Sequence, residues 1–134
     1  MRKIVVDTSV LIDFSRAKTG PYPKLFELFK EGVCELCLPT VVISELWAGR
    51  SMSRKSVLSE TIKMISMIER VELNEKIAMT AGELLRKKQV LGFDAIVAAT
   101  ALTLGAEVAT QNEKHFKNVK ELKIFNLKRD QEVI

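Results

Sequence analysis

The sequence predicts an α/β fold, a three-layer α/β/α sandwich around a mostly parallel central sheet. Three observations lead to this prediction. Short apolar runs of strand length alternate with segments of helical spacing, as in strand–helix–strand units. The run from Ile4 to Val6 is continuously apolar, which is typical of a parallel strand buried on both faces and favours a central position in the sheet. A segment rich in small residues, 95–104, leads almost directly into another apolar run.

Capping residues and chain breakers set the boundaries of the expected elements. Ser, Thr and Asn accept hydrogen bonds from the free N–H groups of a helix's first turn, and Gly commonly ends a helix. Thr8 or Ser9, Thr40 and Asn74 are therefore expected as N-caps. The expected elements are a strand over 3–7, a short helix before a break at 20–23, a helix over 24–30, a strand over 34–38, helices over 40–48 and about 57–68, a weak strand over 70–73, helices over 75–88 and 94–104, and strands over 107–110 and 123–125. The charged end is expected to be a frayed tail.

Length and composition favour one folded domain over residues 1–134. Hydrophobic residues make up 47% and charged residues 28%, which is close to the globular average and argues against disorder or a coiled coil. The longest uncharged stretches, 36–44 and 95–105, are too short to cross a bilayer. Asp7 interrupts any apolar signal region after the basic start, so we expect a cytoplasmic protein with no membrane association.

The charge balance is mildly basic. Lys and Arg number 21 against 17 Asp and Glu, which gives a net charge of +4 and a bias toward polyanionic partners. Basic residues cluster at 50–55, 86–88 and 114–128. Phosphate contact and ordinary solvated faces explain these clusters equally well.

The two cysteines are expected to be buried thiols. Cys34 and Cys37 lie three residues apart in the expected strand 34–38, so their side chains point to opposite faces and do not chelate together. A structural zinc also needs about four ligands, and the chain contains one histidine, His115.

Three acids occupy positions where a carboxylate is unusual. Asp7 ends the first strand at the sheet edge where ligands of parallel α/β folds bind. Glu45 shares a helical stripe with Val41 and Val42, where a carboxylate requires a partner. Asp94 opens the helix rich in small residues and shares its buried face.

Each acid also has an ordinary explanation. Asp7 is suited to capping the following helix, Asp94 to a favourable interaction with a helix dipole, and Glu45 to a surface salt bridge with Arg50 or Lys55. All three explanations must hold together for the site to be absent, so we favour a shared site.

Converging carboxylates favour a hard divalent cation. Oxygen ligands select Mg²⁺ or Mn²⁺ over zinc, so the acids predict a magnesium-type site. Thr8 and Thr110 follow expected strands and are candidates to hold a water or a phosphate oxygen, although turn capping explains them too. Asn112 is a candidate fourth oxygen ligand.

Together these motifs resemble the PIN domain, particularly the VapC-type toxins. The resemblance covers nearly the whole chain, from Lys3 to Phe125. Its motifs are Asp7-Thr-Ser-Val-Leu-Ile-Asp13, Ser44-Glu45-Leu46, Phe93-Asp-Ala-Ile-Val-Ala-Ala99 and Thr110-Gln-Asn112.

The resemblance implies a magnesium-dependent endoribonuclease that cleaves RNA, usually as a homodimer, and that an antitoxin protein often inhibits. Asp7, Glu45 and Asp94 match the family's three most constant acids, and they are the expected catalytic and metal-binding residues. Asn112 stands where the wider family has a fourth acid, a loss for which Glu113 is a candidate compensation. His115 stands where an acid is common, another departure from the pattern.

Basic side chains are expected to hold phosphates that flank the cleavage site. The candidates are Arg50, Arg86, Lys87 and Lys114. The apolar excess between Val57 and Ile68 is either core or a dimer interface.

Two other classes of function compete with the nuclease. A catalytically silent PIN-like module that binds RNA or a partner is compatible with Asn112. A magnesium-binding phosphoacceptor receiver fits less well, because Pro39-Thr40 and Gln111-Asn112 stand where such a domain carries its aspartate and lysine.

Overall fold

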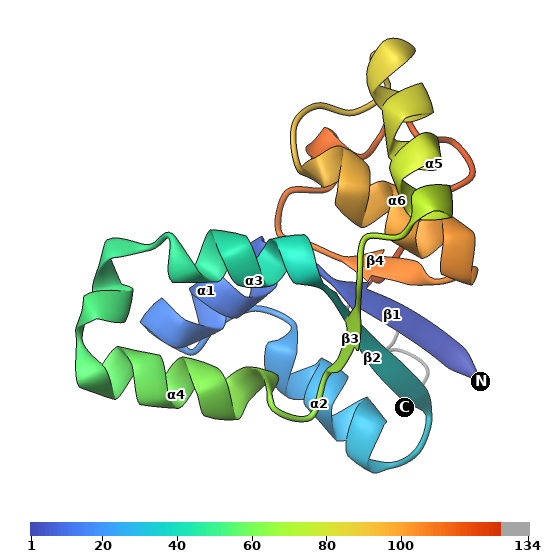
Figure 1. The fold of residues 1–134 in the computed structure, drawn as a ribbon. Helices are drawn as coiled ribbons and strands as arrows, with labels where there is room; N and C mark the ends of the chain where they lie inside the picture. The colour runs from blue at the N-terminus through green and yellow to red at the C-terminus, as the bar shows by residue number, and fades with distance from the viewer. Residues whose placement is uncertain (127–134) are drawn as a thin grey trace.

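The computed structural model describes residues 1–126 and contains one five-stranded sheet in the order β3-β2-β1-β4-β5 (Figure 1). Every pair of neighbouring strands is parallel. The strands are β1 Arg2–Val6, β2 Cys34–Pro39, β3 Glu69–Val71, β4 Glu107–Ala109 and β5 Lys123–Ile124. The α/β fold and the central position of the first strand are confirmed.

Helices connect the parallel strands. The α-helices are α1 Thr8–Ala17, α2 Tyr22–Lys30, α3 Thr40–Trp47, α4 Lys55–Ile65, α5 Glu75–Arg86 and α6 Asp94–Leu104, and the short 3₁₀ helices are η1 Arg50–Ser53 and η2 Glu113–His115. The element types agree with those expected from the sequence, and most boundaries differ by a few residues at one end.

The strand order places the helices in two layers. The connections from β1 to β2 and from β2 to β3 step in the same direction, and right-handed crossovers put their helices on one face of the sheet. The connection from β3 to β4 steps back across the sheet, which puts α5 and α6 on the other face (Figure 1). The predicted three-layer sandwich is therefore present. The reversal of direction between the two sets of connections creates a topological switch point at the carboxyl ends of β1 and β4.

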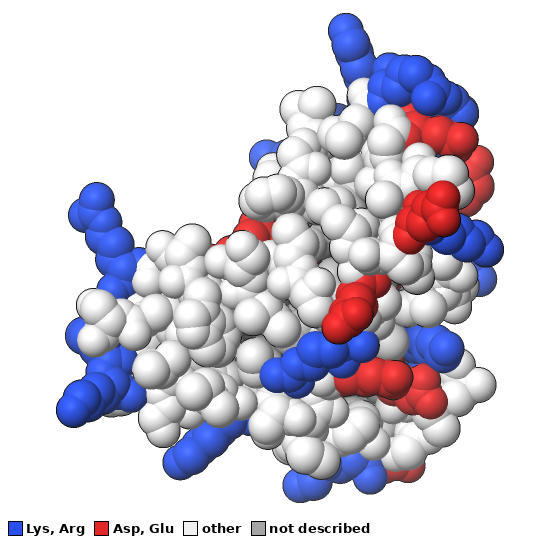
Figure 2. Space-filling view, viewed as in Figure 1, with Lys and Arg blue, Asp and Glu red and all other residues white. Residues whose placement is uncertain are grey.

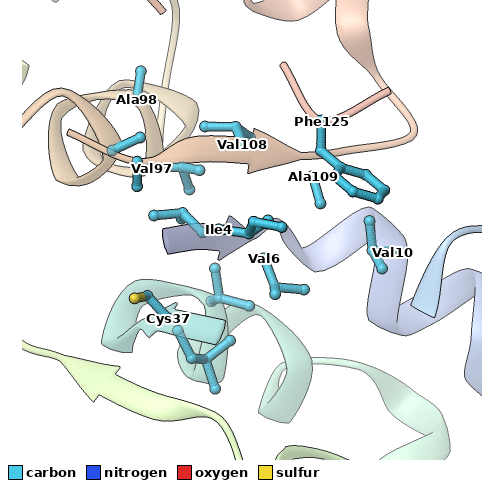
Figure 3. Close-up of a cluster of buried hydrophobic side chains, with 14 of the residues drawn as sticks. Ile4, Val6, Val10, Cys37, Val97, Ala98, Val108, Ala109 and Phe125 are labelled. Carbon is cyan, nitrogen blue, oxygen red and sulfur yellow. The ribbon is translucent and has the colours of Figure 1, made fainter. Parts of the chain in front are cut away.

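The core is built around β1. Ile4, Val5 and Val6 have no exposed surface, because both faces of the sheet are covered. Figure 3 shows side chains from β1, β4, α1 and α6 gathered around this strand, including Val10 and Val97, which are fully buried. Tight packing here fixes the backbone from which the residues after β1 and β4 project.

Two of the three expected capping arrangements are wrong. Asn74 does cap α5, where its Oδ1 accepts a hydrogen bond of 2.9 Å from the Ile77 N–H. Thr8 and Thr40, however, are the first residues of α1 and α3, and the N-cap positions belong to Asp7 and Pro39. Neither of these two side chains caps its helix by a hydrogen bond, because the Asp7 carboxylate has other partners and Pro39 has no polar side-chain group.

The apolar segment 57–68 divides between core and surface. Met64, Ile65 and Ile68 are buried, whereas Ile62 and Met67 are 49% and 57% exposed. Trp47, the last residue of α3, is 42% exposed. The expected frayed tail lies beyond the described residues.

Cys34 and Cys37 are buried free thiols, as expected. Within residues 1–126, none of the helices has both the length and the apolar character needed to span a bilayer.

Candidate active site

The switch point of the sheet brings Asp7 and Thr110 together. Asp7 follows β1 and Thr110 follows β4, and the two strands are hydrogen-bonded neighbours, continued by a 3.0 Å bond from the Asp7 N–H to the Ala109 carbonyl. Asp7 is only 4% exposed. Its Oδ2 accepts hydrogen bonds from the hydroxyls of Thr110 at 2.8 Å and Ser9 at 2.9 Å. A buried carboxylate is thereby satisfied without a basic partner.

Each of these two hydroxyls also accepts a backbone hydrogen bond. The Gln111 N–H donates to Ser9 Oγ at 2.9 Å, and the Asn112 N–H donates to Thr110 Oγ1 at 3.0 Å. The carboxylate oxygen of Asp7 accepts, so each hydroxyl is the donor in its bond to Asp7. This network joins the start of α1 to the segment after β4. Ser9 was expected only as a cap, and its position two residues after Asp7 was the sequence signal for its role at the site.

Glu45 reaches the same region from α3. Its Oε1 accepts a hydrogen bond of 2.7 Å from the Thr8 hydroxyl. Burial raises the pKa of Glu45, the Thr8 hydrogen bond opposes this, and repulsion from Asp7 and Asp94 raises the pKa further. Among the described residues no basic side chain forms an ion pair with Glu45, so a surface salt bridge does not account for it.

Asp94 enters the site as the first residue of α6. Its side chain is 26% exposed, and its Oδ2 lies 3.0 Å from His115 Nδ1, which donates to it. Burial and the nearby charge of Asp7 raise the pKa of Asp94, and the hydrogen bond and charge of His115 lower it. His115, a departure from the family pattern, is thus a direct partner of a candidate catalytic acid.

The three acids line one open cleft of about 510 Å³. Its complete lining is Asp7, Thr8, Ser9, Ile12, Asp13, Glu45, Asp94, Gln111, Asn112 and His115. Asn112 and Thr8 therefore line the same cleft as the acids, whereas Glu113 is exposed and is not among the lining residues. Asp13 adds a carboxylate that the sequence interpretation did not assign to the site.

The donor set of this cleft suits a hard divalent cation. It contains carboxylate, hydroxyl and amide oxygens, and within residues 1–126 neither Lys nor Arg pairs with Asp7, Glu45 or Asp94. The same described residues include no group of three His, Cys, Asp or Glu side chains arranged, as they stand, to hold a metal ion. Two of the acids are directed instead at Thr8 and His115. The chemistry fits, and joint ligation requires the three carboxylates to come closer together than they stand.

The candidate basic residues lie on different parts of the surface. Arg50 lines a separate cleft of about 530 Å³ together with Arg16 and Arg54. Lys114 lines a cleft that adjoins the acids. Arg86 and Lys87 lie at the carboxyl end of α5, where Figure 2 shows basic side chains gathered.

Comparison with known proteins agrees with the sequence motifs. The model of the PIN domain family matches residues 4–122. Ribonuclease VapC19 of Mycobacterium tuberculosis is 29% identical over 117 residues, which cover 84% of this chain and 90% of that protein. Ribonuclease VapC1 of Methanocaldococcus jannaschii is 29% identical over 131 residues, which cover 92% of this chain and 88% of the relative.

Solved structures show the same fold. The DNA-bound VapBC of Salmonella typhimurium superposes with a TM-score of 0.79 at 25% identity, covering 93% of this chain and 98% of that one. VapBC2 of Rickettsia felis, bound to a DNA fragment from its promoter, gives a TM-score of 0.77 at 24% identity over 92% and 98% of the two chains. With the family match extending from β1 to beyond η2, the chain belongs to the PIN domain family.

Proposed function

We propose that this protein is a magnesium-dependent endoribonuclease that hydrolyses RNA phosphodiester bonds as the toxin of a toxin–antitoxin pair. The observation that carries the proposal is the cleft in which Asp7, Glu45 and Asp94 meet at the carboxyl edge of a parallel sheet. Burial first, and after it repulsion from neighbouring carboxylates, raises the pKa of Glu45 and of Asp94, and a divalent cation would relieve the repulsion. Relatives named as ribonucleases VapC, which this chain matches over most of its length, support the assignment.

The chain's own groups have distinct parts in this proposal. Asp7, Glu45, Asp94 and Asn112 would hold Mg²⁺, or Mn²⁺ in its place. The bound ion would supply positive charge for phosphate oxygens and acidify water for in-line attack. Ser9 and Thr110 hold the Asp7 carboxylate in place, because both hydroxyls donate to its Oδ2. Glu45 and Asp94 are the carboxylates available to accept a proton from the attacking water.

The proposal extends to the protein's partners and location. Several of the matching solved structures are toxin–antitoxin complexes, which supports an antitoxin partner for this chain. Exposed apolar side chains such as Ile62, Met67 and Trp47 support a homodimer, because burying them offsets the cost of their exposure. We place the protein in the cytoplasm, where its RNA substrate is found.

The decisive experiment is cleavage of a mixed RNA pool with Mg²⁺, with Mn²⁺ and with a chelator. Cleavage is expected with either metal and not with the chelator. The control is Asp7→Asn, which is expected to lower metal-dependent cleavage at least about 100-fold while the far-UV circular dichroism spectrum stays unchanged. Full activity of this variant, or equal activity with the chelator, would refute the proposal.

The silent binding module is the second candidate, and one observation favours it. Within the described part of the chain the acids are not arranged, as they stand, to hold a metal ion. A thermal-unfolding titration separates the two candidates. An unfolding midpoint that rises with Mg²⁺ in the wild type and not in Asp7→Asn supports the nuclease. If the protein binds RNA and its unfolding midpoint does not change with Mg²⁺, the silent module is supported.

A further inference from the structure

A second cleft adjoins the acids on the far side of Asp94. It has a volume of about 500 Å³ and is lined by Lys88, Gln89, Val90, Leu91, Asp94, Lys114, His115 and Asn118. Asp94 and His115 line both clefts, so the hydrogen-bonded pair forms the wall between them. The two clefts therefore adjoin, and a polymer whose reacting group lies beside the acids can extend past this pair into the second cleft.

Two lysines make this second cleft attractive to an anion. Lys88 comes from the loop after α5 and Lys114 from η2, so the two charges approach from separate segments. Within residues 1–126 neither lysine forms an ion pair. Their charges are therefore available to a phosphate group. Lys88 also has a φ of 56°, a left-handed conformation that is unusual for a residue with a side chain.

The other lining residues suit a nucleobase. Val90 is buried and Leu91 is 74% exposed, so an apolar surface borders the cleft and remains open to solvent. Gln89 and Asn118 add side-chain amides, groups that carry both donors and acceptors and so match the edge of a base. The Gln89 side chain donates a long hydrogen bond of 3.4 Å from its Nε2 to the backbone carbonyl of Asn118.

We propose that this cleft binds the nucleotide next to the scissile phosphate of a single-stranded RNA. Lys88 and Lys114 hold its phosphate, Leu91 packs against its base, and Gln89 and Asn118 read the base edge. The volume suits a single nucleotide, and a base must leave its stack to enter, so the cleft selects unpaired RNA. This assignment rests on the nuclease function proposed above and adds the residues that choose where the RNA is cut.

Binding and cleavage test the assignment separately. Binding of a fluorescein-labelled single-stranded RNA is measured by anisotropy in the Asp7→Asn background, where the strand stays intact. Lys88→Gln and Lys114→Gln are each expected to weaken binding about 5–10-fold, and Leu91→Ala about 3-fold. The matched control is Lys63→Gln, which makes the same charge change at an exposed position of α4. It is expected to alter binding less than 2-fold.

Base reading is tested in the active protein. The double variant Gln89→Ala and Asn118→Ala is expected to change which positions of the RNA pool are cut while the total rate stays within about 3-fold. Unchanged cleavage positions would overturn the base-reading role.

The outcomes distinguish this assignment from the function on which it rests. Single-stranded RNA that binds equally to the Lys88, Lys114 and Lys63 variants, or double-stranded RNA that competes equally well, overturns the cleft assignment even if cleavage is observed. Binding that depends on both lysines in a protein without metal-dependent cleavage overturns the nuclease function and leaves the cleft as an RNA-binding site.

Discussion

Asp7 and Cys37 are equally buried ionisable groups on neighbouring parallel strands, yet their surroundings differ completely. Asp7 is 4% exposed and Cys37 is 3% exposed. Two hydroxyls donate to the Asp7 carboxylate at the carboxyl edge of the sheet. Burial, followed by the charge of Glu69, raises the pKa of the Cys37 thiol to about 11 and keeps it neutral. Burial alone therefore does not mark a site. The difference lies in whether the fold supplies donors for the charged form.

The largest expected effect sharpens this contrast. Asp94→Asn should reduce metal-dependent cleavage at least about 100-fold, because the Asp94 carboxylate lines the cleft. It should not lower thermal stability, because this side chain is not part of the hydrophobic core. Cys37→Ala should do the opposite. It should leave cleavage nearly unchanged and cost about 1–2 kcal/mol in the free energy of unfolding, because the sulfur fills packed space. Cleavage assays and urea denaturation check both variants. Near-normal cleavage by Asp94→Asn would break the contrast.

The hydroxyls around Asp7 give the next prediction. Thr110→Val removes the 2.8 Å donor to Asp7 and should lower cleavage about 10–100-fold, because residues that orient ligands act through them. Thr100→Val is the matched control, since the Thr100 hydroxyl is equally buried but donates to the Ile96 carbonyl within α6. Steady-state cleavage rates of both variants provide the measurement. If the two changes have the same effect, the network around Asp7 has only a structural role.

A smaller effect is expected on stability. The fold raises the pKa of Glu45, so the ionised side chain is less favourable in the folded than in the unfolded chain. Glu45→Gln keeps an oxygen for the Thr8 hydroxyl and removes the charge. It should raise the unfolding midpoint of the metal-free protein at pH 7.5 by a few degrees, as measured by scanning calorimetry. A lowered midpoint would mean that the carboxylate contributes to the fold and is not held there at a cost.

The last expected effect concerns Cys37 at alkaline pH. The unfolded thiol ionises near its ordinary pKa of 9.0, whereas the folded thiol holds its proton to about 11. Because the unfolded state loses the proton first, stability should fall as pH rises between about 9 and 11. In Cys37→Ala this part of the slope should be absent. Urea denaturation of both proteins across this range provides the measurement, and identical slopes would contradict the environment described for the thiol.

Local sequence patterns were sufficient to predict the order and type of the strands and helices. The apolar run 4–6, the Asn74 cap and Gly105, which ends α6 with a φ of 65°, each act within a few residues of chain. Helix starts were predicted less well at Thr8 and Thr40. A side chain suited to capping can be used elsewhere when a tertiary partner competes for it, and Thr8 donates to Glu45, 37 residues away.

The three acids of the candidate site could be singled out from the sequence, but the residues that contact them could not. Asp7, Glu45 and Asp94 stand out because carboxylates are rare on apolar stripes and at strand ends. In the sequence Ser9 was noted only as a cap and His115 only as a departure from the family pattern. The contacts of both residues with the acids, and the place of Asp13 in the cleft, follow from how α1, η2 and α6 meet at the edge of the sheet. Lys88 was not singled out either, although Arg86 and Lys87 of the same basic run were, because only the tertiary structure shows that Lys88 lines the cleft beside Asp94.

By itself the sequence determined the succession of strands and helices, the burial of β1 and the identity of the three acids, since periodicity and residue chemistry are local properties. Only the tertiary structure decided that the acids line one cleft, that hydroxyls and not basic side chains hold Asp7, and that a second cleft lies behind the Asp94–His115 pair. The physical reason is that most of these relations join residues 21 to 103 positions apart, and their distances are set by strand order and helix packing, which no short stretch of sequence encodes.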